Sequence, residues 1–387
     1  MRAAQAGAGR LIYLDHHAAT PLDPRVREVM ARAHDVAWAN PSSVHKAGRQ
    51  SRAFLERARE QVARSIGAQP ADLVFTSGGT EACHLALFGS VSDARRATPR
   101  HIVTTSIEHP AVSMPLASLE ARGVARVTRL GIPGGLAPSV ESFAASLADD
   151  TALVAIQWVN HETGTVLPVA EYAAVCRARG VRCFIDATQA LGKLPIDVET
   201  LGADLVALAA HKISGPSGAG ALWIRRGVEI EPQALGGSQE RGRRAGTQDV
   251  VALVGFGTAC EFVPERLAAQ PNIARLRDRL EEALLGLGGI RNADAGPRVP
   301  TVTNLSFRSW RGEAIVAALD LEGVAVSSGA ACSSGKSEPS PVLLAMHPDE
   351  PWRAGSALRS SFGPESKESD VEFAIAAVRT ALARPPA

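Results

Sequence analysis

Two charged residues directly follow apolar runs in the middle of the chain. Asp186 ends the run CFID, and Lys212 comes 26 residues later, after DLVALAAH. A carboxylate at the end of a buried strand is costly unless a cation or a donor pairs with it. A lysine in apolar surroundings loses proton affinity, which is the state that forms a Schiff base. A third feature, the turn TSGGTEA at 76–82, places glycine amides at a helix start, where phosphate binds.

Each of these features also has a simpler role. The glycine turn can be a plain connection from strand to helix, Asp186 can cap the segment after it, and Lys212 can extend to solvent. Their combination and order favour one shared site, because pyridoxal phosphate needs a phosphate cradle, a carboxylate for its pyridine nitrogen and a Schiff-base lysine. His109, in SIEHPAV, adds an imidazole that could stack on that ring, although a lone histidine is more often a packed core or surface residue.

Cys332 stands in VSSGAACSSGKSEPS (326–340), among Ser, Gly and Ala and without a second Cys or His nearby. The five cysteines are odd in number and form no C-x-x-C pair, so we expect neither a metal site nor a disulfide framework. This pattern favours a reducing compartment, the cytoplasm. The net charge of +1 gives no electrostatic reason to expect nucleic acid or an anionic membrane as a partner. No apolar stretch is long enough for a membrane span.

Short apolar runs alternate with helix-length segments through the middle of the chain. This alternation predicts an α/β fold with a mostly parallel sheet covered by helices on both faces. Apolar residues at three- and four-residue spacing predict helices over 51–67 and 272–288. Ligands of such sheets bind at the carboxyl ends of the strands, where the residues above are placed. The expected strands lie within 72–79, 101–106, 152–159, 183–187, 204–210 and 220–226.

The sequence after residue 288 suggests a smaller α+β unit. The stretch FVPERLAAQPN, near residues 262–270, carries two prolines and predicts a linker. We therefore expect an N-terminal segment (1–19) that packs with the small domain, a large cofactor-binding domain (20–262) and a small C-terminal domain (263–387). The first ten residues, MRAAQAGAGR, are expected to form a disordered lead-in.

Eight motifs, in order, together resemble the cysteine desulfurases of the NifS/IscS type. These are class V, fold-type I pyridoxal-phosphate enzymes, and the resemblance runs from about residue 11 to 380. It implies a large domain with a mostly parallel seven-stranded sheet and a smaller α+β C-terminal domain that carries a mobile catalytic loop. The motifs are YLDHHAATPLDP, NPSSVH, FTSGGTEA, IEHPAV, DATQALGKLPID, AHKISGPSGAGALWIRR, GGSQERGRRAGT and VSSGAACSSGKSEPSPVL.

The resemblance implies a role for each residue of a cofactor site. Lys212 would hold pyridoxal 5′-phosphate as a Schiff base and move protons, and His109 would stack on the ring. Asp186 would pair with the pyridine nitrogen and Gln189 with the ring hydroxyl. The phosphate would be bound by Gly79, Thr80 and His211, and Thr247 would reach the phosphate of a neighbouring subunit, which implies a homodimer with shared sites.

The resemblance also implies the reaction. The substrate would be L-cysteine, whose carboxylate Arg359 would bind in the bidentate way suited to a guanidinium. The Cys332 thiolate would attack the substrate sulfur, which leaves L-alanine and a persulfide on the enzyme. The persulfide sulfur would pass to an acceptor protein, for example in iron–sulfur cluster assembly. A loop of small residues would leave the thiol of Cys332 free to move between the cofactor site and the acceptor protein.

This chain departs from the family pattern at three places. His161, in VNHETGT, stands where the family usually has an asparagine that contacts the cofactor hydroxyl, and it could donate the same hydrogen bond. Ala209 replaces a serine that offers a hydroxyl to the phosphate, and the phosphate turn reads GGTEAC. Two alternatives stay open on the same residues. One is a selenocysteine lyase, another sulfur-amino-acid lyase or an aminotransferase, and the other is a non-catalytic subunit of a sulfur-transfer assembly.

Overall fold

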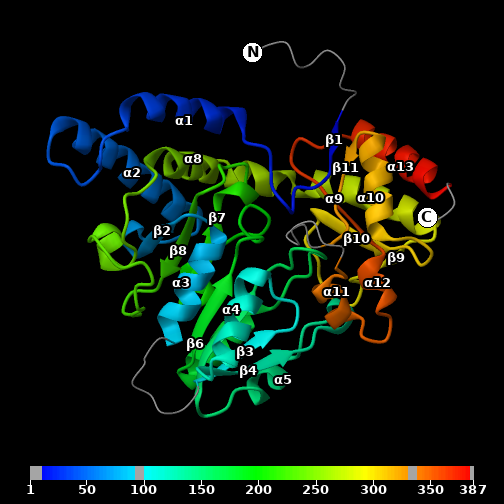
Figure 1. The fold of residues 1–387 in the computed structure, drawn as a ribbon, viewed down its shortest axis with the longest axis horizontal. Helices are drawn as coiled ribbons and strands as arrows, with labels where there is room; N and C mark the ends of the chain where they lie inside the picture. The colour runs from blue at the N-terminus through cyan, green and yellow to red at the C-terminus, as the bar shows by residue number, and fades with distance from the viewer. Residues whose placement is uncertain (1–10, 92–99, 330–337, 384–387) are drawn as a thin grey trace.

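The computed structural model describes residues 11–91, 100–329 and 338–383. Cys332 and the first ten residues, for which a disordered lead-in was expected, lie outside the described residues. The large part of the molecule is built on a seven-stranded sheet of order β2-β8-β7-β6-β5-β3-β4 (Figure 1). Only β8 runs antiparallel to its neighbours. The strands are β2 (Leu73–Thr76), β3 (Arg100–Thr105), β4 (Ala125–Leu130), β5 (Thr151–Gln157), β6 (Arg182–Asp186), β7 (Leu205–Ala209) and β8 (Gly220–Ile224).

Helices cover both faces of this sheet, as the apolar runs predict. Figure 1 shows α3 and α4 together on one side, and their buried residues form one core cluster with the sheet. A second cluster joins the opposite face to α1, α2, α6 and α8. The helices are α1 (Pro24–Val36), α2 (Lys46–Ser65), α3 (Gly79–Val91), α4 (Pro110–Ala121), α5 (Val140–Ala145), α6 (Val169–Arg179), α7 (Val198–Leu201) and α8 (Val250–Glu261).

The C-terminal part forms a third core cluster around a short antiparallel sheet of order β12-β10-β9. Ile12 and Leu14 of the N-terminal segment belong to this cluster, and β1 pairs in parallel with β11. In Figure 1 the blue strand β1 accordingly lies within the yellow-to-red part of the chain. The elements are β1 (Ile12–Tyr13), α9 (Val263–Gly286), β9 (Ile290–Arg291), β10 (Val302–Ser306), α10 (Gly312–Leu321), β11 (Val324–Ala325), α11 (Pro341–Met346), α12 (Trp352–Gly355), β12 (Ala357–Ser361) and α13 (Glu368–Leu382).

The stretch expected as a linker is helical, which corrects that prediction. Helix α9 starts at Val263, nine residues before the predicted start at 272. Pro264 occupies the first turn, where no amide partner is needed, so it favours a helix start. Pro271 lies inside the helix and removes one hydrogen bond, but the buried face of α9 continues past it. The division into domains at 262/263 stays a prediction. Among the described residues, no helix combines the length and apolarity that crossing a bilayer requires.

Candidate active site

The carboxyl ends of β2, β6 and β7 meet at one cavity of about 340 Å³. The sequence-predicted residues that line it come from five separate segments of the chain, and parallel strand direction brings them to the same edge of the sheet. Cys83, Thr188 and Gln157 also line it, and the sequence analysis did not include them. The predicted residues in the lining are Gly79, Thr80, His109, His161, Asp186, Gln189, His211 and Lys212.

The glycine turn between β2 and α3 forms one wall of the cavity. A Cβ at Gly220 of the neighbouring strand would lie 2.5 Å from the backbone of Gly78, so this close approach requires glycine. A Cβ at Gly79 would lie 3.0 Å from Thr188 Oγ1. Helix α3 therefore begins with its first amides beside the cavity, where its dipole favours an anion. The Ser77 amide is not free, because it donates to Glu81 Oε2 at 2.7 Å.

Asp186, the last residue of β6, is 7% exposed. Its Oδ1 accepts a hydrogen bond from the Thr188 amide at 2.9 Å, which is the local bond that the capping alternative predicts. The residues directly after it form turns and no α-helix, however, and Asp186 lines the cavity. Burial raises the pKa of the neighbouring Cys83 thiol well above its ordinary value, and the charge of Asp186 raises it further. Cys83 is thus a protonated thiol and not a nucleophile.

Lys212 ends the 3-10 turn Ala210–Lys212 that follows β7. Its Nζ does not extend to bulk solvent. It donates to the main-chain oxygen of His17 at 2.7 Å and to that of Ala18 at 2.8 Å. Because these carbonyls belong to the N-terminal segment, a residue 195 positions away holds the lysine at the cavity. This contact excludes the simple snorkelling alternative for Lys212.

Three histidines line the cavity, and burial keeps each of them neutral near pH 7. His109 caps α4, and its Nδ1 accepts the Ala111 amide hydrogen at 3.0 Å. Its ring lies 4.9 Å from that of His161, at 76°. Burial holds the pKa of His161 well below its ordinary value, and the charges of Arg359 and Lys212 lower it further. Burial and the Lys212 charge lower the pKa of His211 to about 4.

Two of the predicted residues that the structure describes, Arg359 and Thr247, do not line this cavity. Arg359, in β12, is 1% exposed, and its Nη2 donates to Asp15 Oδ1 at 2.7 Å. Its Nη1 donates to the main-chain oxygen of His161 at 3.1 Å. Arg359 therefore contacts a residue that lines the cavity, but it does not line the cavity itself. Thr247 is exposed on the loop before α8. Cys332 lies outside the described residues, and nothing structural is assigned to it.

Comparison with known proteins identifies the family. The sequence model of the class V aminotransferase family matches residues 12–373. The chain belongs to the class V aminotransferase family. A cysteine desulfurase of Enterobacter agglomerans is 39% identical over 381 residues, which cover 96% of this chain and 93% of that protein.

Solved structures with a similar fold agree with this assignment. A NifS-like protein superposes with a TM-score of 0.89 at 32% identity, covering 96% of this chain and 99% of that one. The protein SspA, solved in complex with cysteine, superposes with a TM-score of 0.80 at 30% identity, covering 92% and 99%. The resemblance and the fold-type I architecture predicted from the motifs are therefore confirmed.

The class V family depends on pyridoxal phosphate, and the cavity fits that group. Two side-chain atoms of its lining residues, Thr188 Oγ1 and His161 Nδ1, are buried and have no hydrogen-bond partner within the described parts of the chain. Buried polar atoms of this kind normally have a partner, which a polar ligand in the cavity would supply. Lys212 Nζ, the Asp186 carboxylate and the start of α3 give the amine, the acceptor and the anion site that the cofactor requires.

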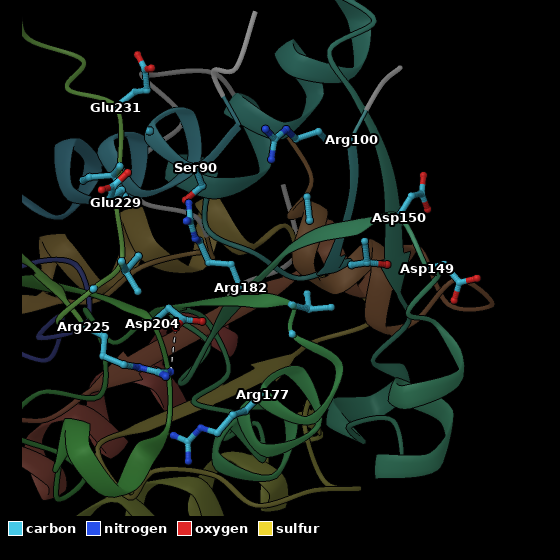
Figure 2. Close-up of a pocket in the computed structure, with 18 of the residues that line it drawn as sticks. Ser90, Arg100, Asp149, Asp150, Arg177, Arg182, Asp204, Arg225, Glu229 and Glu231 are labelled. Atoms are coloured by element: carbon cyan, nitrogen blue, oxygen red, sulfur yellow. Dashed lines mark ion pairs between the residues drawn. The ribbon is translucent and has the colours of Figure 1, made fainter. Parts of the chain in front are cut away.

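A second, larger cavity of about 940 Å³ lies at the opposite edge of the seven-stranded sheet. Figure 2 shows its labelled arginines and carboxylates facing one open space. Charges of both signs line it, and Arg225 pairs with Asp204 at 2.9 Å. It lies at the amino ends of β3, β5 and β6, beside Arg100, Thr151 and Arg182. Ligands of such sheets bind at the other edge, so this cavity is not the active site.

Proposed function

We propose that this protein is a cysteine desulfurase that converts L-cysteine to L-alanine and keeps the sulfur as a persulfide on Cys332. One observation carries the proposal: Lys212, Asp186 and His109 line a single cavity beside the phosphate turn. Curated cysteine desulfurases at about 40% identity over most of the chain support the same activity. Cysteine as the substrate is further supported by the bound cysteine in the structure of the neighbour SspA.

The residues of the cavity divide the proposed chemistry among them. When bound, pyridoxal phosphate supplies an electron sink that labilises the α-proton of an amino acid. Lys212 Nζ would bind the cofactor and would accept and return the α-proton, since its amine is held at the cavity by two carbonyls. Asp186 would pair with the pyridine nitrogen and keep it protonated, and the neutral His109 ring would contact the ring of the cofactor. The start of α3, with Gly79, Thr80 and His211, would bind the phosphate.

Cys332 completes the proposed reaction. Its thiolate forms a bond to the substrate sulfur while the bond between that sulfur and the substrate Cβ breaks, and the carbon fragment takes up a proton to become alanine. The described residues on either side of its segment contact one buried carboxyl group. Ser340 Oγ donates to Glu162 Oε2 at 2.6 Å, and a Cβ at Gly329 would lie 3.3 Å from the same oxygen.

The finer parts of the proposal rest on the resemblance. Arg359 would bind the substrate carboxylate, which requires a change in its contact with Asp15. His161 and Gln189 would contact the ring hydroxyl. Thr247 would serve the phosphate of a partner subunit, so the protein would be a homodimer. We place the protein in the cytoplasm, where a sulfur-acceptor protein, such as an iron–sulfur scaffold, would receive the persulfide sulfur.

Release of alanine and sulfide from L-cysteine tests the proposal. We expect turnover by the wild type, none by Lys212→Ala, and loss of persulfide-dependent sulfide release by Cys332→Ser when reductant is limiting. Selenocysteine and cysteine sulfinate are compared as substrates. Faster turnover of either of these, with unchanged activity in Cys332→Ser, would favour a lyase instead. Absence of a cofactor absorbance band that depends on Lys212 would favour a non-catalytic subunit.

A further inference from the structure

Lys193 is a buried lysine close to the active-site cavity that the proposed mechanism does not use. It follows β6 in the turn that contains Gln189, and it is 8% exposed. Its Nζ donates a hydrogen bond to Gln189 Oε1 at 2.8 Å. A buried lysine is rare unless its amine has a defined partner, and here the partner is the side-chain amide of a cavity residue. The contact therefore needs an explanation.

Among the described residues, the charged groups that line the small cavity beside Lys193 are cations. A small cavity of about 20 Å³ touches Lys193, and the titratable groups that line it are Lys212, Arg266 and His16, from three other segments. Among the described residues, no Asp or Glu lines this cavity. Burial, together with the charges of Lys212 and Arg266, holds the pKa of Lys193 well below its ordinary value. A neutral amine still donates a hydrogen bond.

Gln189 connects Lys193 to the catalytic lysine. Its Nε2 donates to the main-chain oxygen of His17 at 2.8 Å, and Lys212 Nζ donates to that same oxygen at 2.7 Å. With Oε1 bonded to Lys193 and Nε2 bonded to His17, the amide of Gln189 is fixed in one orientation. A side-chain amide has two N–H donors, so one remains for the cavity that Gln189 lines.

We propose that Lys193 is a positioning residue, which holds the Gln189 amide so that it presents an N–H donor, and not its carbonyl oxygen, to the cofactor. This inference rests on the proposed function, because the partner of that donor is the ring oxygen of pyridoxal phosphate. The ring oxygen carries negative charge. The Lys212 nitrogen that is bound to the cofactor can lose its proton. The hydrogen bond from Gln189 then stabilises the charge on the ring oxygen more strongly. Loss of the Gln189 hydrogen bond therefore favours the form in which this Lys212 nitrogen keeps its proton.

The test is the pH at which the visible absorbance band of the cofactor bound to Lys212 changes, measured on the loaded protein. We expect Lys193→Met and Gln189→Leu each to raise this midpoint, by up to about one pH unit, a tenfold change in proton affinity. The double variant is expected to show the same midpoint as Gln189→Leu alone, because Lys193 acts through Gln189. Lys46→Met, the same substitution at an exposed lysine of α2, is the matched control and should leave the midpoint unchanged.

Two results would overturn the inference. An unchanged midpoint in Lys193→Met shows that Lys193 does not position the donor, and additive shifts in the double variant show that it acts on Lys212 by charge. If Lys193→Met does not fold, Lys193→Gln replaces it. The glutamine chain is one bond shorter, and its amide offers an acceptor as well as a donor, so it no longer fixes the orientation of the Gln189 amide and must also raise the midpoint. A wild-type protein without any cofactor band would instead contradict the proposed function, which separates the two failures.

Discussion

At the scale of single residues, His161 shows how burial decides the state of a group. It stands where the family usually has asparagine, but its pKa lies well below the ordinary histidine value because it is buried beside other positive groups. A neutral imidazole and an amide can each donate one hydrogen bond to a ligand. We expect His161→Asn to bind the cofactor and to change kcat/KM by a factor that stays constant between about pH 6 and 8. A factor that varies with pH in this range would show that His161 titrates during turnover.

Glu108 is a second buried group whose charge state depends on its surroundings. It is buried, and this burial, with the nearby Asp186 charge, raises its pKa to about 8, although Thr105 and the Gln157 amide donate to it. The native state therefore keeps a proton that the unfolded state releases near pH 4.5. Raising the pH from about 4.5 to 8 then lowers the free energy of unfolding, by an amount on the order of a few kcal/mol.

Glu108→Gln is expected to remove this part of the pH dependence, because an amide stays neutral throughout. Denaturant unfolding at several pH values measures the difference between the variant and the wild type. The variant should gain stability relative to the wild type as the pH rises, and a difference that is independent of pH would show that Glu108 is ionised in the native state. Glu60→Gln, at an exposed position of α2, serves as the control.

At the scale of elements, Glu281 ties helix α9 to the small sheet. Its carboxylate accepts hydrogen bonds from Arg298 at 2.8 Å, Arg291 at 2.8 Å and Thr303 at 2.5 Å. Burial opposes the charge, but the bonds from Arg298 and Thr303 and the charges of both arginines outweigh it and lower the pKa of Glu281 to about 2. This contribution to stability is complete above about pH 4.5 and is lost as the pH falls toward 2.

Glu281→Gln should destabilise the protein by about 1–3 kcal/mol at neutral pH, because it leaves two partly buried arginines without their carboxylate. Urea unfolding followed by circular dichroism measures this loss. Glu282→Gln, the next residue on the same helix and exposed, should change stability by less than about 0.5 kcal/mol. Equal effects of the two substitutions would contradict the role given to Glu281.

The elements also show how far the sequence predicts this fold. Six strands of the large sheet were predicted because their apolar runs are buried on both faces. Strand β4 was missed because it is an edge strand in which only Ala125 is buried, so it carries charged residues like a loop. The helical start of α9 is not predicted from the sequence, because two prolines, Pro264 and Pro271, indicate a break, whereas a proline in the first turn is compatible with a helix.

The residues that line the cavity could be predicted from the sequence to a similar extent. Residues at strand ends, such as Asp186 and Lys212, could be brought together by the rule that parallel strands end at one edge. The contact of Lys212 with His17 could not be predicted, because it is made by a main-chain oxygen 195 residues away. Lys193 was likewise missed, since no side-chain pattern in the sequence shows which amide it holds.

At the scale of the whole molecule, the proposed homodimer would share its sites between subunits. Thr247 is exposed and lies outside its own subunit's cavity, which agrees with a role toward a partner. Thr247→Ala should weaken cofactor binding about tenfold or more, because a hydrogen bond to a charged phosphate is lost. We expect that mixing the Thr247→Ala chain with the inactive Lys212→Ala chain, under conditions that exchange subunits, restores tight cofactor binding. In the mixed dimer, one site has Lys212 from the first chain and Thr247 from the second. Failure of the mixture to recover would contradict shared sites.

The central claim for the whole molecule is that sulfur leaves L-cysteine and stays on Cys332. The most direct measurement is the mass of the cofactor-loaded protein after one equivalent of L-cysteine, without reductant, together with the alanine released. The account predicts that the wild type gains the mass of one sulfur atom on the peptide that contains Cys332 and releases one alanine, and that Cys332→Ser gains none. Alanine release without any gain of sulfur by the wild type, or an equal gain by Cys332→Ser, would contradict it.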